Sequence, residues 1–368
     1  MKKLLIASAV SALFAAPATV LAQAKPPAVP TLDKVLEASG ISVSGYIDAG
    51  YTHADRNIEA PNFSTRVFDS QNNSFALHQF GLTVAKQPKE GFGGLVNITV
   101  GKDAQVIHSF PEVAPGSMFD ITQAFLQYAG GPLTVIAGKF TTLHGTEVIA
   151  SSGNTNVSRS ILFGAVPFTH TGLRATWALG DTVSLIAGVN NGWDQLTDAN
   201  RGKTLELGAT FAPIKPLSIV VSGYSGKEPT SATTEGTRTS LNAVVSYTII
   251  DPLSVGLEYL SVSQENAGGG TTKQKYSGVA GYVSFMFAPK LRGALRVESF
   301  DDKDGFHFAT TGTKYKEFTV TGAYLASDSF EARVEGRRDN ATNTVFTDYA
   351  AAASKTMTSI ALQGLYKF

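Results

Sequence analysis

The stretch SFEARVEGRRD, residues 329–339, places apolar and charged side chains at alternate positions. Phe330, Ala332 and Val334 share one side of an extended chain, because successive side chains of a β-strand point to opposite faces. The opposite side carries Glu331, Arg333, Glu335, Arg337 and Asp339. The stretch therefore predicts a β-strand with one apolar face and one polar face.

The same period of two begins at residue 41 and continues to residue 368, with no domain boundary. It is clear in residues 204–211, TLELGATF, where Glu206 lies on the polar side. In the first strand, residues 41–53, Asp48 lies on the polar side and Val43 and Ile47 lie on the other. Alternation alone fits a soluble β-sandwich as well as a membrane barrel.

The connections between strands separate these two folds. Seven short turns fall at residues 88–91, 130–132, 180–181, 212–216, 251–252, 288–290 and 326–328. Eight long polar loops fall at residues 55–71, 104–116, 144–170, 191–201, 227–236, 264–273, 301–313 and 340–355. Short turns that alternate with long loops are typical of transmembrane antiparallel up-and-down β-barrels. We expect an all-β fold of this kind with about sixteen strands. Fourteen and eighteen remain alternatives, because residues 72–86, 118–129 and 274–287 carry apolar side chains on both faces.

The amino-terminal segment predicts export. Residues 1–24 combine Lys2 and Lys3 with an apolar stretch and small residues, as in a cleaved secretory signal. The apolar stretch is too short to span about 30 Å of hydrocarbon. Residues 25–40 predict a Pro-rich spacer and a short helix, and residues 41–368 predict the barrel. We expect the mature protein in the bacterial outer membrane.

Composition argues against several other functions. The chain contains no cysteine, which excludes disulfides, thiolate metal sites and cysteine nucleophiles. Basic and acidic residues number 30 each, and this balance argues against nucleic acid as a partner. The six histidines are scattered, and no nucleophile elbow, zinc-spaced histidine pair or phosphate loop is present in the sequence. We therefore expect no enzymatic activity, no cofactor and no metal.

Barrel size predicts the function, because about sixteen strands leave an aqueous channel. We expect a porin that allows passive diffusion of ions and small hydrophilic solutes. The alternatives are a substrate-specific channel for organic or amino acids and, further off, a barrel enzyme or an adhesin. The predicted pore-lining residues are charged groups on the polar strand faces and in the loop 144–170. They are Asp48, Lys139, Glu147, Arg159, Arg174, Glu206, Arg238, Glu258, Arg292, Arg296, Glu298, Glu331, Arg333, Glu335 and Arg337.

The loop 144–170 is the longest connection. Long loops in compact folds are usually functional, so Glu147, Asn154, Asn156 and Arg159 are predicted to line a constriction opposite basic strand residues. The alternative is a solvated lid in which Arg159 ties the loop to a wall. For the charged ladder of residues 331–337, mutual pairing that stiffens the wall is as well supported as a role in selectivity.

The closing strand carries Ile360, Leu362, Tyr366 and Phe368 at alternate positions. Tyr366 and Phe368 resemble the terminal aromatic signal that the barrel-assembly machinery reads.

Several segments resemble the OmpL-like family of β-barrel porins of Gram-negative bacteria. They include SGYIDAGYTH from Ser44, GFGGLVNITVG from Gly91, DITQAFLQY from Asp120 and AGKFTTLHGTEVI from Ala137. The resemblance implies an outer-membrane pore for small hydrophilic solutes, with outer-membrane lipid and lipopolysaccharide around it and a homotrimer as its assembly. The loop 144–170 lacks the acidic PEFGGD stretch of general porins, so no constriction residues carry over from that group.

Overall fold

The computed structural model describes residues 31–58, 65–111 and 116–368. The chain forms two compact units, Met1–Ser39 and Gly40–Phe368. In the first unit, α1 (Leu32–Ser39) lies within the segment for which the sequence predicts a short helix. The predicted signal, residues 1–24, lies outside the described residues. Within the described ranges, no helix is long and apolar enough to cross a membrane.

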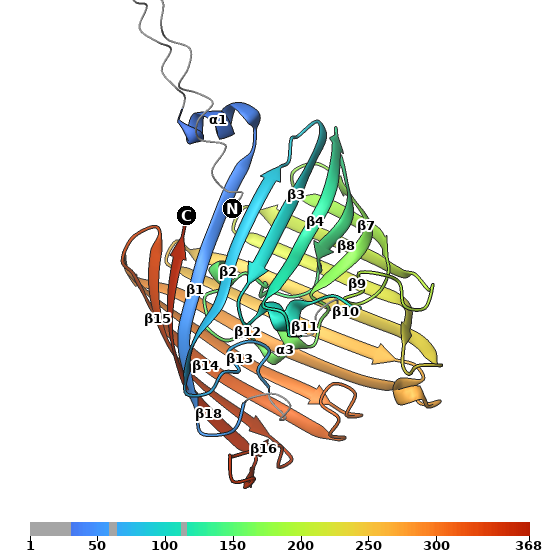
Figure 1. Ribbon diagram of the computed structural model, residues 1–368, viewed down its shortest axis with the longest axis vertical. Helices are drawn as coiled ribbons and strands as arrows, with labels where there is room; N and C mark the ends of the chain where they lie inside the picture. The colour runs from blue at the N-terminus through green and yellow to red at the C-terminus, as the bar shows by residue number, and fades with distance from the viewer. Residues whose placement is uncertain (1–30, 59–64, 112–115) are drawn as a thin grey trace, which may run out of the picture. The chain divides into compact units, whose positions relative to one another are not determined.

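In the described part of the second unit, sixteen antiparallel strands form one closed barrel (Figure 1). Each strand pairs with its neighbours in sequence, and β1 closes the ring against β18, with Tyr46 opposite Lys367 and Ala54 opposite Ser359. The strands are β1 (Ser42–Ala54), β2 (Ser74–Lys86), β3 (Gly91–Val100), β4 (Phe119–Gly130), β5 (Leu133–Thr141), β6 (Thr169–Ala178), β7 (Val183–Asn190), β8 (Thr204–Ile214), β9 (Leu217–Pro229), β10 (Glu235–Ile250), β11 (Leu253–Gln264), β12 (Gln274–Ala288), β13 (Leu291–Asp302), β14 (Thr313–Leu325), β15 (Phe330–Ala341) and β18 (Thr356–Lys367). This confirms the predicted barrel and its sixteen strands.

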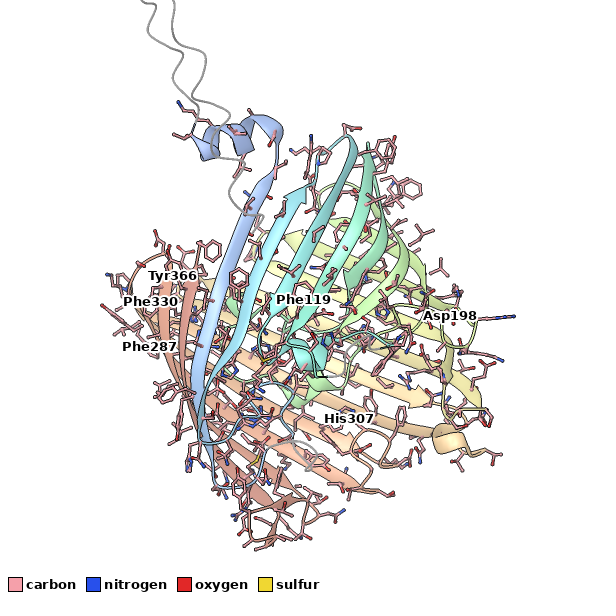
Figure 2. The ribbon with its side chains drawn as sticks, viewed as in Figure 1. Phe119, Asp198, Phe287, His307, Phe330 and Tyr366 are labelled. Carbon is pink, nitrogen blue, oxygen red and sulfur yellow. The ribbon has the colours of Figure 1, made fainter. Side chains whose placement is uncertain are left out.

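The outer face of the barrel is apolar. Leu205 and Leu207 are 60% and 66% exposed, whereas Glu206 between them is fully buried on the inner side. Figure 2 shows Phe287, Phe330 and Tyr366 on the outer side near one rim, where aromatic girdles of membrane barrels lie. Closure leaves no unpaired sheet edge, so the strands satisfy their backbone hydrogen bonds with one another, as a lipid environment requires.

The seven short turns fall where the sequence predicts them, and one long loop does not. The predicted loop 227–236 is wrong, because β9 and β10 pair as far as Pro229 and Glu235 and leave only residues 230–234 as the connection. Above a membrane, a hairpin can be polar on both faces, so its polar sequence resembles that of a loop. The last long loop contains its own hairpin, β16 (Phe346–Thr347) with β17 (Ala353–Ser354).

Short helical segments lie in the other loops. They are α2 (Ala104–Ile107), η1 (Ser151–Gly153), α3 (Ile161–Gly164) and η2 (Ala267–Gly269). Phe68, Ile107, Ile149 and Phe163 come from three different loops and form one buried apolar cluster. The loops that follow β1, β3 and β5 therefore pack on one another.

Candidate functional site

The loop of residues 142–168 lies across the interior of the barrel. The backbone N–H of Leu143 donates to the Tyr224 hydroxyl on β9 at 2.8 Å, and Gln79 on β2 donates to the carbonyl of Ile149 at 3.0 Å. The Tyr276 hydroxyl on β12 donates to the carbonyl of Ala165 at 2.6 Å. Because β2, β9 and β12 occupy separate arcs of the ring, the loop narrows the space that they enclose.

Three carboxylates of the barrel wall hold backbone N–H groups of this loop. Glu258 on β11 accepts from Thr146 at 2.9 Å. Glu298 on β13 accepts from residues 161 and 162 at 2.8 and 2.6 Å, and Glu335 on β15 accepts from residues 157 and 158 at 2.7 and 2.9 Å. Each of these oxygens satisfies a backbone N–H group that has no partner in a strand ladder, so these contacts fix the path of the loop.

Three arginines of the same wall hold carbonyl groups of the loop. Arg296 donates to Ser158 at 2.8 Å, Arg337 donates to Arg159 at 2.6 Å, and Arg333 donates to Asn156 at 3.3 Å. Arg296 also bonds the Glu147 carboxylate of the loop at 2.7 Å. The wall thus satisfies both the donors and the acceptors of a backbone segment that makes no ladder of its own.

Arg159 does not reach the wall with its side chain. It donates to the carbonyls of Val148, Ile149 and Val157 at 3.0, 3.0 and 3.1 Å, so it closes the loop on itself. Its guanidinium also lies over the rings of Phe68 and Phe163, 5.4 and 5.7 Å from their centroids. The sequence-based alternative, in which Arg159 ties the loop to the wall, holds only for its backbone carbonyl, which accepts from Arg337.

Most of the charged side chains that the sequence predicts to line the pore are buried in the structure. The buried ones are Asp48, Lys139, Glu147, Arg159, Glu206, Glu258, Arg296, Glu298, Glu331, Arg333, Glu335 and Arg337. Arg174, Arg238 and Arg292 are partly exposed. The structure brings together the charges on β13 to β15 and Glu147, which ion pairs link to one another. Their role in permeation stays a prediction.

Many of these charges are also paired within the wall. Arg174 bonds Glu206 at 2.9 Å, and Lys139 lies 3.3 Å from Asp120. Arg333 bonds Glu331 at 2.7 Å, and Arg337 bonds Asp339 at 2.7 Å; Arg292 contacts Glu331 as well. The ladder of residues 331–339 therefore has the mutual pairing that is one of its two predicted roles.

A polar anchor at the start of the loop was not anticipated from the sequence. His144 contacts the hydroxyls of Ser222 and Ser240 through its two ring nitrogens, at 2.7 and 2.8 Å, and the N–H of Gly145 donates to Asn242 at 3.0 Å. Burial and the neighbouring His170 lower the pKa of His144 to about 3, so its imidazole is neutral at pH 7. The strand residues of this anchor occupy inward positions but carry no charge, which is why charge patterning misses them.

Two hollows lie between the loop 142–168 and the barrel wall. One has a volume of about 260 Å³ and lies against β1, β3 and β4, where Tyr46, Asn97 and Thr122 line it. The other has a volume of about 410 Å³ and lies against β9 to β12, near the short turns. Glu147 lines both. Among the described residues, no group of three or more histidine, aspartate or glutamate side chains could hold a metal ion.

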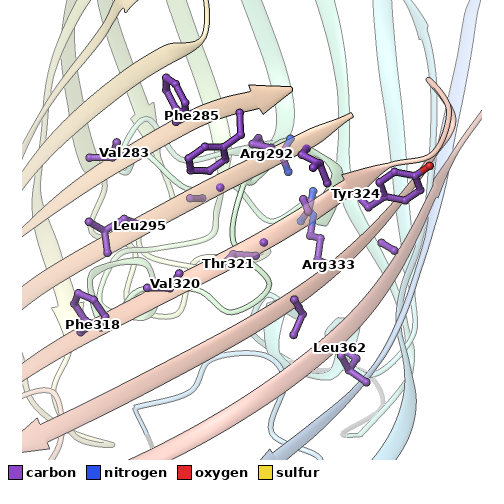
Figure 3. Close-up of a pocket in the computed structure, with 18 residues that line it drawn as sticks. Val283, Phe285, Arg292, Leu295, Phe318, Val320, Thr321, Tyr324, Arg333 and Leu362 are labelled. Carbon is purple, nitrogen blue, oxygen red and sulfur yellow. The ribbon is translucent and has the colours of Figure 1, made fainter. Parts of the chain in front are cut away.

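Another hollow, of about 1040 Å³, lies on the outer face over β12 to β15. Phe285, Leu295, Phe318 and Tyr324 line it (Figure 3). This apolar lining matches acyl chains rather than hydrophilic solutes. The candidate site for hydrophilic solutes is therefore the lumen beside the loop 142–168.

A closed barrel with an apolar outer face and a loop folded into a polar interior defines the class of outer-membrane channel proteins. Residues 40–368 match the sequence profile of the family described as Putative beta-barrel porin-2, OmpL-like, and the chain belongs to this family. The protein is accordingly a porin of the bacterial outer membrane. No curated protein sequence matches it significantly.

Solved structures share the fold at low sequence identity. The outer membrane channel DcaP of Acinetobacter baumannii is 15% identical, with a TM-score of 0.61, over 89% of this chain and 97% of that one. The anion-selective porin from Comamonas acidovorans is 10% identical, with a TM-score of 0.62, over 89% and 99%. The trimer form of OmpT from Vibrio cholerae is 10% identical, with a TM-score of 0.60, over 89% and 99%.

Proposed function

We propose that small hydrophilic solutes and ions diffuse passively through this barrel along the sides of the loop 142–168. The observation that carries the proposal is the loop itself, which is fixed to the inner wall by Glu258, Glu298 and Glu335 and leaves hollows of about 260 and 410 Å³ against that wall. A loop fixed by the wall narrows a pore without filling it. Passive diffusion then requires neither a reaction nor an energy source.

The test is swelling of vesicles that contain the folded protein. Transfer into an isotonic glycerol solution should cause rapid swelling, whereas protein-free vesicles of the same lipid should swell slowly. The control is Ser254→Trp, which places a bulky side chain in the larger hollow and should slow glycerol entry. Equal rates with and without protein would contradict the proposal.

A substrate-specific channel is the second candidate, and one observation favours it. The loops after β1, β3 and β5 pack together through Phe68, Ile107 and Phe163, so three loops rather than one narrow the interior. A narrow passage gives each lining group a larger effect on the solute. Saturation of the flux at millimolar solute would support this candidate, and a linear rise would support the general pore.

We further propose that the protein forms a homotrimer, an assembly that OmpT of Vibrio cholerae has in its trimer form. The outer face over β1, β2, β15 and β18 has a hollow of about 600 Å³ with small residues at outward positions, among them Ala49, Ala332 and Gly364. Small residues on a lipid-facing surface permit close approach of a second subunit. Gly364→Leu should fill the hollow and shift the mass measured by light scattering in detergent toward the monomer. A monomeric native protein would contradict this proposal.

A further inference from the structure

The larger hollow beside the loop is lined on its wall side by hydroxyl groups from four neighbouring strands. The strand register places Ser218 of β9 opposite Ser246 of β10, Thr248 of β10 opposite Ser254 of β11, and Ser254 opposite Ser284 of β12. All five residues line the hollow. The Thr248 and Ser254 hydroxyls are 3.2 Å apart. Four neighbouring strands thus present one type of polar group to the same space.

Few charged side chains in this hollow are free to contact a solute. Among the described residues that line it, Glu147 and Lys215 are the charged ones. Both carboxylate oxygens of Glu147 are engaged, one by Arg296 at 2.7 Å and the other by the N–H of Ser160 at 2.7 Å. Lys215 lies in the turn before β9, at the rim, and is exposed. The charged side chains that contact the loop backbone are elsewhere on the wall: Glu258, Glu298, Glu335, Arg296, Arg333 and Arg337.

The chemistry of this lining matches uncharged solutes that carry several hydroxyl groups. Each serine or threonine hydroxyl can both donate and accept, as each hydroxyl of a sugar or polyol can. Tyr282, which also lines the hollow, adds an aromatic face for the apolar side of a sugar ring. The volume of about 410 Å³ falls within the roughly 300–1,000 Å³ of small-molecule sites. An ion would lose part of its hydration shell here without a charge to replace it.

We infer that the hydroxyl row of Ser218, Ser246, Thr248, Ser254 and Ser284 is a binding track that favours neutral polyhydroxylated solutes, such as sugars and polyols, over ions. This inference rests on the proposed passive pore and names its preferred class of solute. It assigns the lumen charges to holding the loop rather than to selecting the cargo.

The experiment compares swelling rates for glucose, gluconate and glucosamine at pH 6, which are similar in size but neutral, anionic and mainly cationic. The track predicts that glucose enters at least about threefold faster than either charged analogue. It also predicts a reversal potential close to zero under a KCl gradient. Ser246→Lys should abolish the advantage of glucose over gluconate and move the reversal potential toward the chloride potential. Ser246 is exposed on the inner face, so the barrel should tolerate the substitution.

The matched control is Thr311→Lys, which adds the same charge in an exposed loop outside the hollow and should change neither measurement. Equal entry of the three solutes would overturn the inference while leaving the pore intact. Marked anion preference in the native protein that disappears in Lys215→Gln would also overturn it, because selectivity would then reside at the rim. Entry of none of the solutes would instead contradict the proposed pore itself.

Discussion

At the scale of single residues, His144 makes the docking of the loop sensitive to pH. In the docked loop its pKa is about 3, against 6.5 for a free histidine, so the neutral form favours docking. The contribution is complete above about pH 6.5 and declines as the pH falls toward 3, by about 1.4 kcal/mol per pH unit. The titratable groups that contact it or lower its pKa are Tyr224 and His170.

This predicts that lowering the pH from 7 to 5 weakens docking by about 2 kcal/mol. Thr155→Cys would supply a single thiol in the loop for an environment-sensitive dye, because the chain has no other cysteine. The dye should report partial release of the loop at pH 5. In His144→Gln, which can still contact both serines, the loss should shrink. An equal pH response in the two proteins would contradict the assignment to His144.

The closure of the barrel depends on Gly45, which lies against Phe368. Phe368 exchanges two backbone hydrogen bonds of 2.9 Å with Gly45. A Cβ on Gly45 would lie 2.4 Å from the ring of Phe368 and 2.8 Å from the carbonyl oxygen of Gly81. Since the backbone contact cannot rotate away, a side chain at residue 45 strains the seam between β1 and β18.

We expect Gly45→Ala to lower the stability of the folded barrel by about 1–3 kcal/mol, measured as the urea midpoint of the slow-migrating band on unheated gels. Gly336→Ala is the matched control, because a Cβ there meets nothing within 4 Å. A similar loss of stability in both variants would show that the effect comes from replacing a glycine in a strand, and not from strain at the seam between β1 and β18.

At the scale of elements, the loop 142–168 is held by the wall rather than by its own secondary structure. Glu298 and Glu335 together accept four of its N–H groups. Replacing both by glutamine leaves each residue one acceptor oxygen in place of two. We expect docking to weaken by about 2–4 kcal/mol, because at each residue one of the two N–H groups loses its acceptor and stays buried.

Trypsin measures this release directly, because Arg159 is the one lysine or arginine in residues 142–168 and is 2% exposed. The double variant should be cut after Arg159 at least about tenfold faster than the native protein. Glu265→Gln, in an exposed part of the loop after β11, should leave the rate unchanged. Resistance of the double variant to trypsin would mean that other contacts hold the loop.

The elements differ in how far sequence predicts them. Strands and short turns follow from local signals, as the alternation of residues 329–339 and the Asp251–Pro252 turn illustrate. The contacts of the loop 142–168 with the wall do not follow from local signals. Glu298 and Ile161, for example, are 137 positions apart in the sequence and meet only when the barrel closes. Sequence therefore identified Glu298 as an inward charge but could not show that the loop backbone covers it. The hydroxyl row was missed for a related reason, since single serines on strands attract no notice until the register aligns them.

At the scale of the whole molecule, the barrel has its apolar side outward and its charges inward, and the interior is then narrowed by three loops. The apolar outer face explains how the barrel sits in the membrane. The hollows beside the loop 142–168 explain where solutes pass through it. Both depend on one claim, that a continuous aqueous path connects the two rims of the closed barrel.

The most direct test is the current through single molecules in a planar lipid bilayer. The folded protein, with KCl on both sides and no energy source, should produce discrete current steps whose size rises in proportion to the salt concentration. Barrels that insert stably but carry no current at any voltage would contradict the account.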